Sequence, residues 1–271
     1  MIFILLSILC SVIIANMLMA FDRNGKPNML PIFLGNYFLA SIFSFLSIPA
    51  NSAPPGVFDL LLGIGAGALF LANFFVFQKS IAANGLSLSV SVMRIAMIIP
   101  ILLSLLLFGD SVNRWNVFGI VIALSAFLLK SDLRGYHTIF WLLALFLVSG
   151  LTDSTLKLFK ELGSGAEPVF IFIIFTAAFF FTLGVIMFKK LPVPLLSLVF
   201  GFLLGIPNRL STVFFLKGLD TVSAAIAYPL TAIGVVMFSI ISDTLIWKRR
   251  VTMREGIMYA LLALSILLLN L

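Results

Sequence analysis

The chain has 271 residues, of which 62% are hydrophobic and 10% are charged. Soluble domains carry about 25% charged residues, so this composition excludes an ordinary water-soluble protein and indicates a lipid bilayer as the solvent. The net charge of +7 does not predict nucleic-acid binding, because most basic residues fall in short loops between apolar segments. The single cysteine, Cys10, excludes an internal disulfide and a cysteine-based metal cluster.

The apolar segments are long enough to be membrane-spanning helices. About 20 apolar residues cross a hydrocarbon core of about 30 Å. No basic stretch precedes the first segment, so we interpret it as a retained helix rather than a signal peptide. In chain order the predicted helices cover residues 2–20, 31–49, 57–78, 87–108, 114–130, 139–159, 168–188, 192–216, 221–246 and 252–270.

The ten segments divide into two five-helix halves, residues 1–130 and 138–271. The stretches that match best are Gly63 to Asp110 and Gly201 to Arg249. Because each half has an odd number of segments, the second half enters the bilayer inverted relative to the first. We therefore expect an all-α integral membrane protein with ten transmembrane helices in two inverted repeats. Secondary transporters are built in this way, with the substrate site at the midplane between the repeats.

Lysine and arginine are distributed unevenly between the two sides of this arrangement. Most of them flank the loops that follow odd-numbered helices, and few flank the other loops. Basic loops stay on the cytoplasmic side, so the charges predict that both termini lie outside.

Two passages resemble the drug/metabolite transporter superfamily, in particular its ten-helix EamA-like branch. Phe108 to Val112, followed by Trp115 to Gly119, is similar to a leucine-glycine-glutamate turn and the helix after it. Val222 to Leu230 is similar to the ninth helix. Asp110 replaces the usual glutamate, and the corresponding turn of the second half, Trp247 to Arg250, has no acid.

The resemblance implies a multi-pass transporter of a bacterial inner membrane, a cavity lined by the third and ninth helices, and a role for Asn73 and Tyr228 in that cavity. Many members of the superfamily keep their termini in the cytoplasm, opposite to the side predicted by the charges.

Two arginines lie inside predicted helices, where an ionisable group costs about 2.5–3.5 kcal/mol at the bilayer centre. Arg94 is a candidate to bind a substrate carboxylate or phosphate through its guanidinium; the alternative is that its side chain extends to nearby headgroups. Arg209 follows Pro207 and Asn208. We expect proline to interrupt the eighth helix there and Asn208 and Arg209 to bind substrate; the alternative is a structural kink.

Asp153 and Lys157 lie four residues apart on one helix face. The favoured interpretation is a structural ion pair between them. The alternative is that Asp153 binds the amine of a zwitterionic substrate or exchanges a proton as substrate binds. Pro100 and Pro229 occupy loosely corresponding helices and are candidate hinges for alternating access; tolerated kinks are the alternative.

Together these features predict a secondary transporter for a small organic metabolite, amino-acid-like or bearing a carboxylate or phosphate. Polar groups within the segments disfavour a non-transporting scaffold or accessory subunit. An integral membrane enzyme acting on lipid would need clustered acids or histidines, so we expect neither an enzyme nor a bound metal or cofactor. The expected partners are the solute, the bilayer and protons, and no nucleic acid. The chain would act as a monomer or as a homodimer. The predicted substrate-binding residues are Asn73, Arg94, Asp153, Asn208, Arg209 and Tyr228.

Overall fold

The computed structural model describes residues 1–23, 29–84, 86–130, 139–246, 248 and 252–269, and these residues contain helices and no strand. The predicted linker between the halves, residues 131–138, lies outside them. The helices are α1 (Ile2–Arg23), α2 (Met29–Leu46), α3 (Val57–Asn84), α4 (Leu86–Ile95), α5 (Ile98–Leu107), α6 (Arg114–Lys130), α7 (Ile139–Leu162), α8 (Glu167–Phe188), α9 (Leu195–Leu219), α10 (Ala224–Leu245) and α11 (Met253–Leu269).

Nine of the predicted helices are confirmed as single helices, and the fourth is two. Two residues, Ala96 and Met97, separate α4 from α5. Pro100 explains the break, because it has no N–H and its ring clashes with the carbonyl four residues earlier, that of Ala96. The Ala96 carbonyl instead accepts a bond from the Ile99 amide at 3.0 Å, and the Arg94 carbonyl accepts one from the Met97 amide at 3.3 Å. The α-helical ladder therefore stops at Arg94.

Two further prolines singled out in the sequence, Pro207 and Pro229, do not break their helices. Pro207 lies inside α9 and Pro229 inside α10, and both helices are continuous. The predicted interruption of the eighth helix is therefore wrong. A proline removes one hydrogen bond, and close packing against neighbouring helices can hold the rest of the ladder together.

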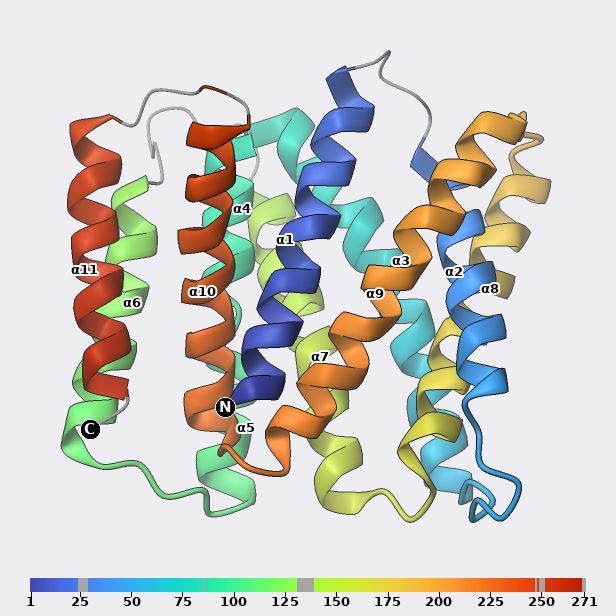
Figure 1. The fold of residues 1–271 in the computed structure, drawn as a ribbon, viewed down its shortest axis with the longest axis horizontal. Helices are drawn as coiled ribbons and strands as arrows, with labels where there is room; N and C mark the ends of the chain where they lie inside the picture. The colour runs from blue at the N-terminus through green and yellow to red at the C-terminus, as the bar shows by residue number, and fades with distance from the viewer. Residues whose placement is uncertain (24–28, 85, 131–138, 247, 249–251, 270–271) are drawn as a thin grey trace.

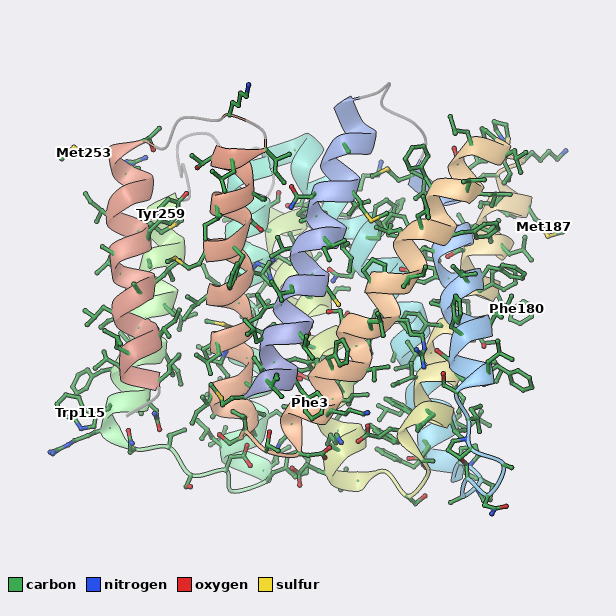
Figure 2. The ribbon with its side chains drawn as sticks, viewed as in Figure 1. Phe3, Trp115, Phe180, Met187, Met253 and Tyr259 are labelled. Carbon is green, nitrogen blue, oxygen red and sulfur yellow. The ribbon has the colours of Figure 1, made fainter. Side chains whose placement is uncertain are left out.

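The composition and surface of these helices are compatible with a membrane protein. Five stretches are long and apolar enough to cross a bilayer: Met29–Leu46, Val57–Phe77, Ile139–Leu162, Glu167–Phe188 and Leu195–Leu219. Large apolar side chains also point outward from the bundle, among them Phe180, Met187 and Met253 (Figure 2). Phe188 is 88% exposed. Monomeric soluble proteins rarely expose contiguous apolar surface on this scale.

Helices from the two halves are packed against each other throughout the molecule (Figure 1). In the first half, α1 packs on α9 and α10, and α2 packs on α8 and α9. In the second half, α7 packs on α3, α4 and α5, and α8 packs on α2 and α3. The pair α6 and α11 lies at one edge of the bundle. Figure 1 also shows that α1, α3 and α6 run in one direction and α7, α9 and α11 in the other.

Glycines on α3 and α9 bring the two halves into backbone contact. A Cβ on Gly67 would lie 2.7 Å from the Ile174 carbonyl oxygen of α8, and one on Gly201 would collide with the Ile32 carbonyl of α2. Gly63 and Gly205, four residues away on the same faces, are equally crowded. Small residues at this spacing allow two helices to approach closely.

Candidate functional site

The main cavity has a volume of about 570 Å³ and lies between helices of both halves. Hydroxyl groups from α1, α9, α10 and α11 line it, together with aromatic rings that include Phe70 and Phe77 of α3 and Phe215 of α9. Five of the six predicted site residues line this cavity or the smaller one beside it. The polar residues that line the main cavity are Ser7, Ser11, Arg94, Asp153, Asn208, Ser211, Thr212, Tyr228, Thr231, Ser239 and Tyr259.

Arg94 and Asp153 place opposite charges in this cavity. Arg94 lies in the last turn of α4, beside the break before α5. Its Nε is buried and makes no hydrogen bond. Asp153 comes from the middle of α7, and among the described residues its carboxylate forms no hydrogen bond or ion pair. The two charges attract each other without forming a salt bridge. Both charged groups are therefore available to a ligand.

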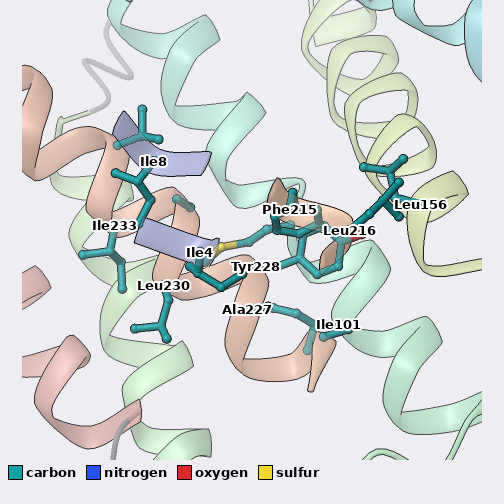
Figure 3. Packing of buried hydrophobic residues seen from close by; sticks show 14 of the residues in the cluster. Ile4, Ile8, Ile101, Leu156, Phe215, Leu216, Ala227, Tyr228, Leu230 and Ile233 are labelled. Carbon is teal, nitrogen blue, oxygen red and sulfur yellow. The ribbon is translucent and has the colours of Figure 1, made fainter. Parts of the chain in front are cut away.

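Tyr228 lines the main cavity together with Phe215. Its hydroxyl donates a hydrogen bond to the backbone carbonyl of Asp153 at 2.5 Å. Its ring packs on that of Phe215, with 4.9 Å between the ring centroids. Figure 3 shows these two rings next to Leu156, Leu216 and other buried apolar side chains. Leu156, Phe215 and Tyr228 of this layer line the cavity, and we call these three residues its floor.

A second cavity of about 310 Å³ adjoins the first and contains Asn73. Phe70, Phe77 and Asn208 line both cavities. Ser149 Oγ donates a hydrogen bond to Asn73 Oδ1 at 2.7 Å, and Asn208 Nδ2 donates to Asn36 Oδ1 at 3.1 Å. The structure thus brings together Asn73, Arg94, Asp153, Asn208 and Tyr228 around connected space.

Arg209 is not part of this group. It does not line either cavity, and its Nε donates to Ser44 Oγ of α2 at 3.2 Å. Successive helical residues are about 100° apart around the axis, so Asn208 lines both cavities and Arg209 lines neither, although both side chains bond to α2. This position does not place Arg209 beside Asn208 in the cavities.

The predicted ion pair between Asp153 and Lys157 is wrong. Lys157 Nζ lies 3.2 Å from Asp110 and 2.6 Å from Glu161. Asp110 follows α5 in the loop before α6, and it also accepts bonds from Ser104 Oγ and from the amide of Ala224, the first residue of α10. A carboxylate at this position is favoured by the helix dipole and by the free amides of the first turn. Lys157 is thereby drawn away from Asp153.

Three hydrogen-bonded serines belong to the cavity but were not among the residues predicted from the sequence. Ser7 Oγ of α1 donates to the Ser211 carbonyl of α9 at 3.0 Å, and the hydroxyls of Ser11 and Ser211 are 2.9 Å apart. All three line the main cavity. Isolated serines in apolar segments carry little signal, because polar bonds between helices are common without a ligand. Only the pairing of α1 with α9 places them together.

Comparison with known proteins establishes the fold and leaves the family open. No family model matches the chain. It is 22% identical to an uncharacterized protein of Haemophilus influenzae over 96% of this chain and 95% of that protein. A solved crystal structure superposes with a TM-score of 0.76 and 14% sequence identity, over 99% of this chain and 98% of that one. The helical arrangement is therefore one that a crystallised protein also adopts.

Proposed function

We propose that this chain is a secondary transporter that moves a small organic solute through the cavity containing Arg94 and Asp153. One observation carries the proposal. The cavity of about 570 Å³ between the two halves is lined by Arg94, whose buried Nε makes no hydrogen bond, and by Asp153, whose carboxylate has no partner among the described residues. Two such charges in a membrane interior are costly and usually mark a substrate or ion pathway.

An inverted repeat of ten spans supports this proposal. Equivalent helices of the halves run in opposite directions (Figure 1). Their packing partners are equivalent as well: α2 packs on α9, and its counterpart α8 packs on α3, the counterpart of α9. In our proposal the five shorter apolar stretches span the membrane together with the five long ones, with α4 and α5 counted as one broken helix.

Individual contacts repeat at a constant interval along the chain. The same number of residues separates Ser11 from Ser149 and Asn73 from Ser211. The hydrogen bond between Ser11 and Ser211 therefore corresponds to the one between Ser149 and Asn73. Gly63 and Gly67 are separated from Gly201 and Gly205 by that same interval, and both glycine pairs lie at contacts between the halves.

The charges favour a solute with a carboxylate or phosphate, and a zwitterion such as an amino acid fits best. A guanidinium binds a planar carboxylate through two parallel N–H groups, while Asp153 would bind an ammonium group. Asp153 is the only acid among the described residues that line the cavity. A proton gradient would therefore act on transport through this group.

The broken helix beside Arg94 fits alternating access. Transporters place substrate at the ends of discontinuous helices, where backbone groups are not used by the helix itself. The floor of Phe215, Tyr228 and Leu156 blocks one end of the cavity, and the bonds from Lys157 to Asp110 hold α7, the α5–α6 loop and α10 together beyond it. In our proposal this is the closed gate of a state that faces the basic, cytoplasmic side.

Membership of the drug/metabolite transporter superfamily, and location in a bacterial inner membrane, remain proposals that rest on the resemblance. One contact supports them: the two passages that carry the resemblance meet in space. Asp110 of the first passage accepts a hydrogen bond from the Ala224 amide of the second, at 3.1 Å. Both passages thus contribute to one structural unit at the closed end of the cavity.

A thermal-shift screen of the purified protein against metabolites tests the binding part of the proposal, because ligands that bind the folded state raise its melting temperature. Amino acids and other carboxylates should stabilise the wild type and fail to stabilise Arg94→Gln. Arg209→Gln is the matched control, since it removes an arginine of α9 outside the cavity. Stabilisation of Arg94→Gln equal to that of the wild type would remove Arg94 from the site.

A further inference from the structure

A third cavity, of about 600 Å³, lies away from the main one between α2, α3 and α8. These helices pack together at one end of the molecule (Figure 1). Ala68 and Ala72 of α3 form its base, and aromatic rings including Phe75 and Phe181 form its sides. Phe75 is 43% exposed and Phe181 40% exposed, so this apolar groove is open to the surroundings of the bundle at these two rings.

Two lysines lie at the mouth of the groove. Lys189 lines it and follows the last residue of α8. Its Nζ lies 5.4 Å from the centre of the Phe75 ring, and Lys79 Nζ lies 5.7 Å from the same ring. Neither lysine has an acidic partner within the part of the chain that the structure describes. Two ammonium groups beside one ring repel each other, so an anion between them would be stabilised.

We propose that this groove binds an anionic phospholipid, with the phosphate between Lys79 and Lys189 and one acyl chain along Ala68 and Ala72. The dimensions agree: Lys189 and Phe181 are about 12 Å apart along α8 at the helical rise per residue, close to half of a hydrocarbon core of about 30 Å. The lysines lie on the basic side of the molecule, where cytoplasmic anionic lipids attract basic residues. The proposal requires insertion in a membrane and is independent of transport.

Native mass spectrometry of the full-length protein in detergent, with added phosphatidylglycerol or phosphatidylcholine, tests this site. The wild type should retain phosphatidylglycerol in preference to phosphatidylcholine. The double variant Lys79→Gln/Lys189→Gln should bind phosphatidylglycerol roughly 30-fold more weakly. Lys217→Gln is the matched control, because Lys217 also lies over a phenylalanine ring, that of Phe3 at 5.7 Å, but does not line the groove.

Ala72→Phe tests the apolar part of the groove independently of the lysines, because the larger side chain would fill the base of the groove while both lysines are kept. It should lower phosphatidylglycerol retention as the double variant does, and inorganic phosphate should not displace the lipid from the wild type. Retention of phosphatidylglycerol by the double variant at the wild-type level would overturn the proposal. Equal retention of the two lipids by the wild type, full retention by Ala72→Phe, or displacement by inorganic phosphate would each do the same.

Discussion

Lys157 pairs with Asp110 from the other half of the chain although Asp153 lies one turn away on its own helix. The Lys157 side chain is 5% exposed and that of Asp110 is 16% exposed. Asp110 also accepts hydrogen bonds from α5 and from the first amide of α10. The pair thus joins three segments, and Lys157 does not pair with Asp153, which lines the main cavity with Arg94.

Removal of the Lys157 charge should destabilise the protein strongly. Lys157→Met leaves Asp110 buried without its cation, and loss of one partner from a buried pair costs about 3–5 kcal/mol. Thermal unfolding in detergent micelles measures the effect. Glu161→Gln is the control, because Glu161 is 35% exposed and such pairs contribute about 1 kcal/mol or less. An equal fall in melting temperature in the two variants would show that the contact with Asp110 stabilises the protein no more than the contact with Glu161 does.

Acid should weaken the contribution of Asp110 to stability. Burial acts to raise the pKa of this carboxyl, but the hydrogen bond from Ser104 and the contacts with Lys157 outweigh burial and hold the pKa below the ordinary value of 3.8. A lowered pKa in the folded state means that the stabilisation is present above pH 3.8 and is lost as pH falls through the folded-state value.

The difference in melting temperature between the wild type and Asp110→Asn should accordingly be constant from pH 7 to about pH 5 and shrink below about pH 4. Melting curves of both proteins across this range provide the measurement. A difference that grew on acidification would contradict the stated direction of the pKa shift.

The glycines at the contacts between the halves should not tolerate a methyl group. Gly201→Ala would press a Cβ into the α2 backbone and should cost about 1–3 kcal/mol, as overpacking does. Gly65→Ala is the matched control, because a Cβ there has no heavy atom within 4 Å and alanine favours a helix over glycine by about 1 kcal/mol. Melting temperatures should therefore fall for the first variant and hold or rise for the second. A similar change in both would argue against close packing of α2 on α9.

The main cavity should be accessible to water from one side of the membrane. Cys10 is the only cysteine, so Cys10→Ser provides a background for single-cysteine labelling. Ser239→Cys, which lies in the cavity away from the floor, should react with a membrane-impermeant maleimide from the side of the basic loops. Ala227→Cys, at a position with 0% exposure, should not react. Labelling of Ser239→Cys only from the opposite side would contradict the proposed orientation of the cavity.

The sequence predicted the helices well, because length, apolar composition and turn residues are local properties. It did not predict the break at Ala96, although Pro100 was a candidate hinge, nor the continuity of α9 through Pro207. Whether a proline breaks a helix depends on neighbouring helices that hold the remaining hydrogen bonds. That information is absent from a single segment.

The charged residues show the same limit. Spacing indicates that Asp153 and Lys157 share a helix face, but it cannot indicate that Asp110 reaches Lys157 from another helix. Nor can it distinguish Asn208, which lines the cavities, from the adjacent Arg209, which does not. Arg94 and Asp153 were each identified from the cost of burying a charge, whereas their meeting in one cavity follows from the packing of α4 against α7.

Solute flux into proteoliposomes tests the central claim most directly. A solute that stabilises the wild type in the thermal-shift screen should enter vesicles containing the wild type or Arg209→Gln. Its uptake should fall about 10-fold or more with Arg94→Gln, since a hydrogen bond to a charged group contributes about 1.5–3 kcal/mol. Undiminished uptake by Arg94→Gln, at equal protein incorporation, would contradict the assignment of this cavity as the transport site.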